Sequence, residues 1–245
     1  MTVEVCAFSL QSCLTAQAAG ADRIELCGSL SEGGTTPSIG LVTQARRHLT
    51  IALYVMIRPR GGDFLYSDTE LDVMRADIEA AKTAGVDGIV LGLLRPDGSI
   101  DEENTKKLVE LAHPLPVTFH RAFDMSRDPA EALEAVIRTG SIRILTSGQA
   151  PSATQGVPVL RKLVEQAAGR IEIMAGVGVS IQNAQALLDA GVGALHLSGK
   201  SSQASAMQYR RQELTMASAV LGEYERIEAS ADAIAPVVEL VHYQK

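Results

Sequence analysis

Aromatic residues are scarce in this sequence: it has no tryptophan, and phenylalanine and tyrosine make up only 4% of its 245 residues. A site built mainly on stacking against bases or sugar rings is therefore not expected. Basic residues are fewer than acidic ones, so the formal net charge is −7 and the isoelectric point is about 5.3. Because nucleic-acid binding requires a concentrated basic surface, we expect no nucleic-acid partner.

Long apolar runs are absent as well. No stretch approaches the ~18 apolar residues of a membrane span, and the first fifteen residues lack the basic start and apolar block of a secretory signal. The cysteines, Cys6, Cys13 and Cys27, are odd in number and confined to the first 27 residues, which is unlike a disulfide framework. We therefore expect a cytoplasmic protein with reduced thiols and no membrane contact.

Short β-branched or apolar runs alternate with longer helix-patterned segments along the chain. This alternation is typical of parallel α/β folds. Gly20, Gly85, Gly140 and Gly191 each follow a helix pattern directly, where a left-handed helix stop is expected. Eight strands are predicted, over residues 3–7, 23–27, 52–58, 88–92, 115–120, 142–147, 171–176 and 194–198.

Eight strands in this alternation predict a (β/α)8 barrel, the TIM barrel, as a single domain over residues 1–245. An open doubly wound sheet is the alternative, but it usually has a glycine-rich first turn, and here that turn reads Ala7-Phe8-Ser9-Leu10. Residues 200–245 exceed the length of one helix. We expect them to form a loop and a helix, near residues 228–242, packed on the barrel, with the excess acting as a lid or an oligomer contact.

Alternate residues of a barrel strand face the helices or the barrel interior. One parity is apolar on every strand, as at Val3 and Ile142, and is expected to face the helices. The other parity is unusually polar for a barrel interior. Its charged members near the strand starts, Glu4, Arg143 and Glu172, predict a structural layer of ion pairs at the bottom of the barrel, because unpaired buried charges are costly.

Polar side chains of the interior parity also gather near the carboxyl ends of the strands, which in a parallel barrel form the mouth where ligands bind. The run Phe119-His-Arg-Ala-Phe-Asp124 places three ionisable groups at one such end. A simple salt bridge between Glu25 and Arg58 is the alternative to a functional role for that pair. The expected mouth residues are Glu25, Cys27, Arg58, His120, Asp124, Ser147 and Gly148.

Glycines follow the seventh and eighth strands, and a helix start at Ser180 follows the first of these turns. Many barrels hold a phosphate on backbone N–H groups of these two loops. Gly176, Gly178, Ser198 and Gly199 are therefore candidates for anion binding. Tight turns that require glycine for their own geometry are the alternative.

A series of blocks runs in order over about residues 1–210, from Cys6 and Gly20-Ala-Asp-Arg-Ile-Glu-Leu-Cys27 to Ile144-Leu-Thr-Ser-Gly148. Together these blocks resemble the CutC family. The resemblance implies a cytoplasmic (β/α)8 barrel, commonly a homodimer, assigned to copper homeostasis, with copper binding through cysteines and no established catalytic reaction. The family often has a further glycine where this chain has Val177. The blocks between the first and the last are Gly33-Gly34 with Thr36-Pro-Ser38, Met56-Ile-Arg-Pro-Arg60 with Gly62-Asp63-Phe64, and Phe119-His-Arg-Ala-Phe-Asp124.

Copper binding is one of the two functions that the mouth residues support. Cu(I) prefers soft sulfur ligands, and Cys6 and Cys27 end adjacent predicted strands on the same parity, so both thiolates can reach one ion. Met56 could add a thioether, and His120 or His196 an imidazole. The alternative is that the two cysteines are simply small buried residues.

An enzyme of the isomerase or lyase type, acting on a small carboxylated or phosphorylated metabolite, is the second function. Arg58 and Arg60 would fix the anion, and His120 would move a proton with its ring held by Asp124 or Glu25. A third class is a scaffold that binds a protein partner through the carboxyl-terminal segment.

Overall fold

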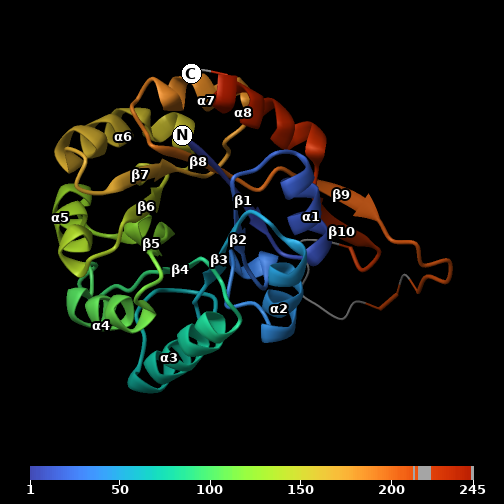
Figure 1. The fold of residues 1–245 in the computed structure, drawn as a ribbon, viewed down its shortest axis with the longest axis horizontal. Helices are drawn as coiled ribbons and strands as arrows, with labels where there is room; N and C mark the ends of the chain where they lie inside the picture. Colours follow the sequence, from blue (N-terminus) through green and yellow to red (C-terminus); the bar gives the residue numbers. More distant parts are fainter. Residues whose placement is uncertain (212, 215–221, 244–245) are drawn as a thin grey trace.

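The computed structural model describes residues 1–211, 213–214 and 222–243, and its eight parallel strands close into a barrel (Figure 1). β1 pairs with both β2 and β8, which closes the ring. The predicted (β/α)8 barrel is thus confirmed. The strands are β1 (Thr2–Ala7), β2 (Arg23–Leu26), β3 (Ala52–Met56), β4 (Gly88–Leu91), β5 (Val117–Phe119), β6 (Arg143–Thr146), β7 (Glu172–Ala175) and β8 (Ala194–Leu197).

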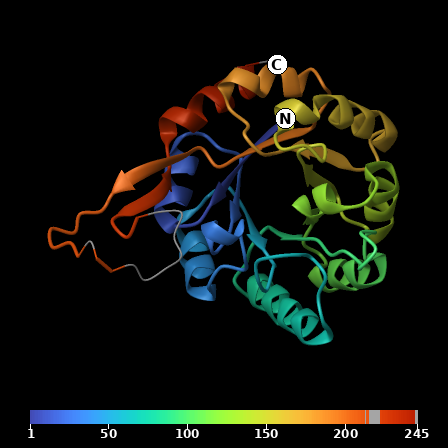
Figure 2. The ribbon, with the colours of Figure 1, turned by 180° about the vertical axis from the view of Figure 1, so that it is seen from behind.

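The helices surround the barrel on its outside, as the view from behind also shows (Figure 2). The predicted glycine stops are confirmed: Gly20, Gly85, Gly140 and Gly191 have φ angles of +87°, +76°, +86° and +88°. The helices are α1 (Leu10–Ala18), α2 (Ile39–His48), α3 (Asp68–Thr83), α4 (Glu102–Ala112), α5 (Pro129–Thr139), α6 (Ala153–Ala167), α7 (Ile181–Leu188) and α8 (Ala231–Tyr243).

The main hydrophobic core lies between the strands and the helices. Val3, Ile24 and Ile89, on the apolar parity, are fully buried in it, as predicted. Ile142 is the exception, with 44% of its surface exposed. It lies just before β6 rather than within it, at the edge of the barrel bottom, where the helix layer does not cover it.

The predicted layer of buried ion pairs at the bottom of the barrel is confirmed. Arg143 on β6 pairs with Glu172 on β7, and Glu4 on β1 pairs with Arg23 on β2. The aromatic ring of Tyr54 lies near both guanidinium groups, 4.8 Å from that of Arg23 and 5.7 Å from that of Arg143. The pairing supplies each buried charge with an opposite charge, which is the condition for burying it.

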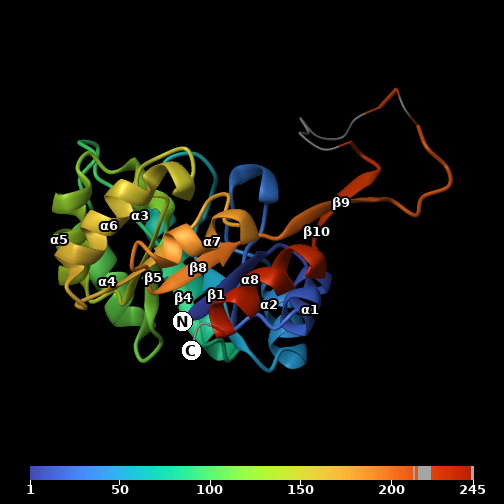
Figure 3. The same cartoon turned by 90° about the horizontal axis from the view of Figure 1, so that it is seen from above.

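The chain after β8 contains two strands that the sequence pattern did not predict. β9 (Lys200–Ala204) and β10 (Glu225–Ala229) form an antiparallel ribbon that projects from the barrel (Figure 3). Their side chains are mostly exposed, so the alternation that reveals a half-buried strand is missing. Part of the ambiguous segment 212–225 lies outside the described residues.

α8 follows the ribbon and confirms the helix predicted near residues 228–242. It packs against α7, α1 and β1 and so fills the last gap in the helix layer. Among the described residues, none of the helices has both the length and the apolar character needed to cross a membrane.

Candidate functional site

A cavity of about 640 Å³ opens at the carboxyl ends of the strands. Its wall combines ionisable side chains from the barrel interior with apolar side chains from the surrounding loops. The candidate site residues that line it are Cys6, Glu25, Arg58, His120, Gly178 and Ser198, and Met56, His196 and Lys200 line it as well.

Two thiols lie close together at this cavity. Cys6 is near the end of β1 and Cys27 directly follows β2, and their sulfur atoms are 3.8 Å apart. Cys27 is buried, whereas Cys6 is only partly buried and lines the cavity. Cys13 lies on α1 within the hydrophobic core, so the structure separates it from the other two.

His196 brings an imidazole to the same place from β8. Its Nε2 lies 3.7 Å from Glu25 Oε2, and potential ligand atoms of Cys6, Glu25 and His196 all lie within 4.8 Å of one another. Its Nδ1 is 2.8 Å from the buried Glu4 carboxylate, which also binds Arg23. A carboxylate on the far ring nitrogen fixes the orientation of the imidazole, as is common for metal-binding histidines.

The proximity of these groups shifts their proton affinities. The hydrogen bond from Cys27 lowers the pKa of Cys6 to about 5, against the effect of burial and with help from His196. Burial alone would lower the pKa of His196, but Glu25, Cys6 and Glu4 raise it well above its usual value. Burial raises the pKa of Glu25 well above its usual value. The resulting state is a Cys6 thiolate beside a protonated imidazole.

His120, at the end of β5, is 97% buried beside the Phe64 ring, with ring centroids 5.0 Å apart. Its Nδ1 accepts a hydrogen bond from the Ala122 N–H, so the ring proton resides on Nε2. Neither Asp124 nor Glu25 orients this ring through a hydrogen bond in the described part of the chain, contrary to the expectation from the sequence. The backbone of the following short helix, Arg121–Met125, does so instead.

The Arg58 side chain connects two loops through hydrogen bonds. Its Nη1 donates to the carbonyl oxygens of Glu32 and Gly34, at 2.7 and 2.8 Å, and its Nη2 donates to that of Gly62 at 2.7 Å. The alternative of a salt bridge between Arg58 and Glu25 is wrong, because these carbonyl oxygens occupy the guanidinium and the ion pairs of the described residues do not include it.

Asp124 and the residues after β6 form a separate network. The Asp124 carboxylate accepts hydrogen bonds from the hydroxyls of Thr146 and Ser147 and from the backbone N–H groups of Ser147 and Gln149. Ser147 is fully buried, and a Cβ on Gly148 would meet the Gly156 carbonyl oxygen at 2.6 Å. Asp124, Ser147 and Gly148 therefore hold the β6 loop against α6 rather than line the cavity.

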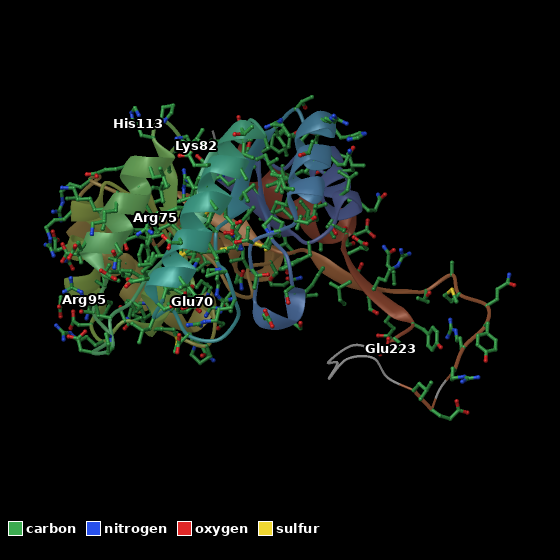
Figure 4. The ribbon with its side chains drawn as sticks, turned by 90° about the horizontal axis from the view of Figure 1, so that it is seen from below. Glu70, Arg75, Lys82, Arg95, His113 and Glu223 are labelled. Carbon is green, nitrogen blue, oxygen red and sulfur yellow. The ribbon has the colours of Figure 1, made fainter. Side chains whose placement is uncertain are left out.

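Arg60 points away from the cavity. It pairs with Glu70, which forms the capping box of α3 with the N-cap residue Ser67, and with Asp63 in its own loop. Figure 4 shows Glu70, Arg75 and Lys82 in order along the outer helix α3, so Arg60 is held at the rim. The sequence could not distinguish this arginine from Arg58, because both stand in the same loop.

The four candidates for anion binding, which follow β7 and β8, divide into two groups. A Cβ on Gly176 would meet Leu145 at 2.6 Å and one on Gly199 would meet Ile234 at 2.5 Å, so close packing explains both. Gly178 and Ser198 line the cavity. Val177 has a φ of +77°, a conformation rare for a β-branched residue.

No role in the site or in the ion-pair layer was predicted for Arg23 or Phe64. Arg23 shares the interior parity with Glu25, so a strict parity analysis could have placed it beside Glu4. Phe64 lies in an irregular loop, where no periodic signal indicates direction, and only the structure shows that it packs on His120.

Comparison with known proteins gives matches over nearly the whole chain. The profile of the CutC family matches residues 1–201. A protein of Chromobacterium violaceum named family protein CutC is 51% identical over 95% of this chain and 94% of its own length. A human protein named copper homeostasis protein cutC homolog is 50% identical over 91% of this chain and 82% of its own length.

Solved structures with the same fold are also found. The crystal structure of the putative copper homeostasis protein CutC from Streptococcus agalactiae has a TM-score of 0.77 and 37% identity, over 81% of this chain and 99% of that one. Phosphoribosyl anthranilate isomerase from Thermus thermophilus has a TM-score of 0.57 at 13% identity, over the full length of both chains, and it shares the barrel fold alone.

Proposed function

The chain belongs to the CutC family, and from that premise we propose that it takes part in copper homeostasis by binding Cu(I) as cargo at the mouth of its barrel. Cys6 and Cys27 would be the sulfur ligands, and His196 would supply the imidazole. We assign this role to the cytoplasm, where a reducing environment keeps the thiols available.

The observation that carries this proposal is the 3.8 Å separation of the Cys6 and Cys27 sulfur atoms beside His196. Cu(I) prefers soft ligands, and thiolates are its preferred protein donors. Cys6 opens into the cavity, so an ion entering from the mouth meets a sulfur atom without any movement of the barrel.

The surrounding charges support the same role. Cys6 has a pKa of about 5 and is already a thiolate at neutral pH. Cys27 and His196 hold their protons, so binding of a metal by all three would release protons from these two. Glu4 and Arg23 would hold the imidazole in place behind the site.

We prefer copper binding over the isomerase or lyase alternative because the acid–base apparatus expected for an enzyme is engaged elsewhere. Arg58 binds three backbone carbonyl oxygens, and Asp124 holds the β6 loop. His120 therefore lacks the carboxylate partner that the enzymatic assignment gave it.

A competitive Cu(I) titration against a chromogenic chelator, under reducing conditions, tests the proposal. Wild-type protein should bind one Cu(I), and the double variant Cys6→Ser, Cys27→Ser should lose at least about a hundredfold in affinity, because two thiolate ligands are removed. His196→Gln should weaken Cu(I) binding by about tenfold or more, because the variant lacks the imidazole ligand; loss of even an indirect partner of a metal ligand has an effect of this size.

Cys13→Ala is the matched control, because this buried cysteine faces the hydrophobic core and should leave the Cu(I) affinity unchanged. Equal affinity in the wild type and the double variant would show that copper does not bind at these cysteines.

A further inference from the structure

A buried hydrogen-bond donor without a partner lies in the wall of the mouth cavity. His120 has its proton on Nε2, because Nδ1 accepts from the Ala122 N–H, and Nε2 has no partner among the described residues. His120 is 97% buried and lines the cavity. An unsatisfied buried donor is costly and uncommon in proteins, and it is explained when a ligand supplies the acceptor.

A buried positive charge stands beside this donor. Arg58 is 95% buried, and no carboxylate pairs with it among the described residues; its guanidinium donates to three backbone carbonyl oxygens. Both Arg58 and His120 pack against Phe64, the guanidinium at 4.9 Å and the imidazole at 5.0 Å from the ring centroid. A buried cation without a counter-charge favours an anionic ligand.

The remaining charges at the cavity do not reverse this preference. Arg121 and Lys200 are cationic residues of its wall, although Arg121 is paired with Asp124. Of the carboxylates at the cavity, Glu32 is exposed, and Glu25 lies beside His196, with 3.7 Å between Glu25 Oε2 and His196 Nε2. Cys6, Glu25 and His196 lie on β1, β2 and β8, whereas Arg58 and His120 follow β3 and β5.

The rest of the wall indicates an organic ligand. Apolar side chains contribute to the cavity from several loops and strand ends, and its volume of about 640 Å³ suits a small metabolite rather than a lone ion. Val177 and Gly178 also line it, and the backbone N–H groups of these two residues have no acceptor within the described ranges. The apolar lining residues include Phe8, Leu30, Phe64, Met125, Leu145 and Leu197.

We propose that this cavity binds a small organic anion, a carboxylate or a phosphate monoester, whose oxygen accepts the Nε2–H of His120 next to the Arg58 guanidinium. This anion site goes beyond copper binding and does not depend on it, because neither His120 nor Arg58 is among the proposed copper ligands.

Two substitutions of His120 separate its two hydrogen bonds. The Asn Oδ1 of His120→Asn can replace Nδ1 as acceptor for the Ala122 N–H, but that variant has no donor at the position of Nε2. The Gln Nε2 of His120→Gln can reach the position of the lost donor instead. The first variant therefore keeps the local fold without the ligand contact, and the second keeps the contact.

Amide NMR titrations of copper-free protein test the proposal, with inorganic phosphate and propionate as the two probes and the Ala122 and Gly178 resonances as readouts. In wild-type protein at least one probe should shift these resonances saturably. His120→Asn should weaken that binding by about tenfold or more, since a hydrogen bond to a charged group is lost. His120→Gln should stay within about threefold of the wild type.

Saturation by phosphate alone or by propionate alone identifies the anionic group of the ligand. The proposal is overturned if neither probe saturates, or if His120→Asn binds as well as the wild type. The Cu(I) titration of His120→Asn should match that of the wild type, so a failure of the anion site is distinguishable from a failure of the copper site.

Discussion

Two histidines line the same cavity, and their surroundings shift their pKa values in opposite directions. Nearby Glu25, Cys6 and Glu4 outweigh burial at His196 and raise its pKa well above the usual value. Burial, with the neighbouring Arg58, lowers the pKa of His120 to about 3. One side of the mouth thus carries a cationic imidazole, and the other carries a neutral one that can only donate from Nε2.

The low pKa of His120 should make folding stability depend on pH. In the unfolded chain this histidine becomes protonated below its usual pKa of 6.5, whereas in the folded protein it stays neutral until about pH 3. Its contribution is therefore complete above pH 6.5 and is lost as the pH falls. Between pH 7.5 and pH 5 the wild type should lose about 2 kcal/mol more unfolding free energy than His120→Asn.

Urea unfolding of both proteins at the two pH values measures this difference. Comparison with His120→Asn cancels the titration of the other groups, including His196, whose contribution has the opposite sign. A parallel decline of the two proteins would contradict the low pKa of His120.

At the scale of elements, the β7–α7 loop contains a strained residue. Val177 has a φ of +77°, where a β-branched side chain is disfavoured, and the Ala153 N–H binds its carbonyl oxygen and holds the loop in this shape. We expect Val177→Gly to stabilise the protein by about 1 kcal/mol, because glycine adopts this conformation without strain.

Thermal or urea unfolding tests the effect of Val177→Gly on stability. Val179→Gly, two residues later, is the matched control. Val179 is buried and is not among the residues with positive φ, so its replacement should destabilise the protein. Destabilisation by both changes would show that Val177 is not strained.

The elements of the barrel were predictable from the sequence because each has a local signal. The apolar parity of Val3 and Ile24 and the glycine stops depend only on neighbouring residues. The convergence of Cys6 and His196 also follows from the fold, since closure of the barrel makes β8 a neighbour of β1.

The partners of the loop arginines were not predictable in this way. Whether Arg58 or Arg60 faces the cavity depends on the path of irregular backbone, which has no period. The ribbon β9–β10 escaped prediction because both faces of its strands are largely exposed, so no hydrophobic alternation marks it.

For the whole molecule, the homodimer implied by the family resemblance stays a prediction. A two-stranded ribbon on its own is marginally stable in water, and here the segment following β9 exposes Met207 and Tyr209 by 56% and 68%. We expect a second copy of the chain to cover these side chains. Sedimentation velocity should give twice the 26.0 kDa of one chain.

The double variant Met207→Ser, Tyr209→Ser should shift that equilibrium toward the monomer. Val73→Ser, on the exposed face of α3, removes a comparable exposed apolar side chain elsewhere and should leave it unchanged. A monomeric wild type would contradict the predicted assembly.

The position of α8 has a consequence for synthesis on the ribosome. Ile234, Val237 and Val241 of this helix are buried against a barrel whose strands are complete at residue 197. The apolar surface between α7 and α1 therefore stays exposed after the last barrel strand has been synthesised. It is covered only when α8 has been synthesised and packs against it. During that interval we expect the nascent barrel to be prone to aggregation and to engage chaperones.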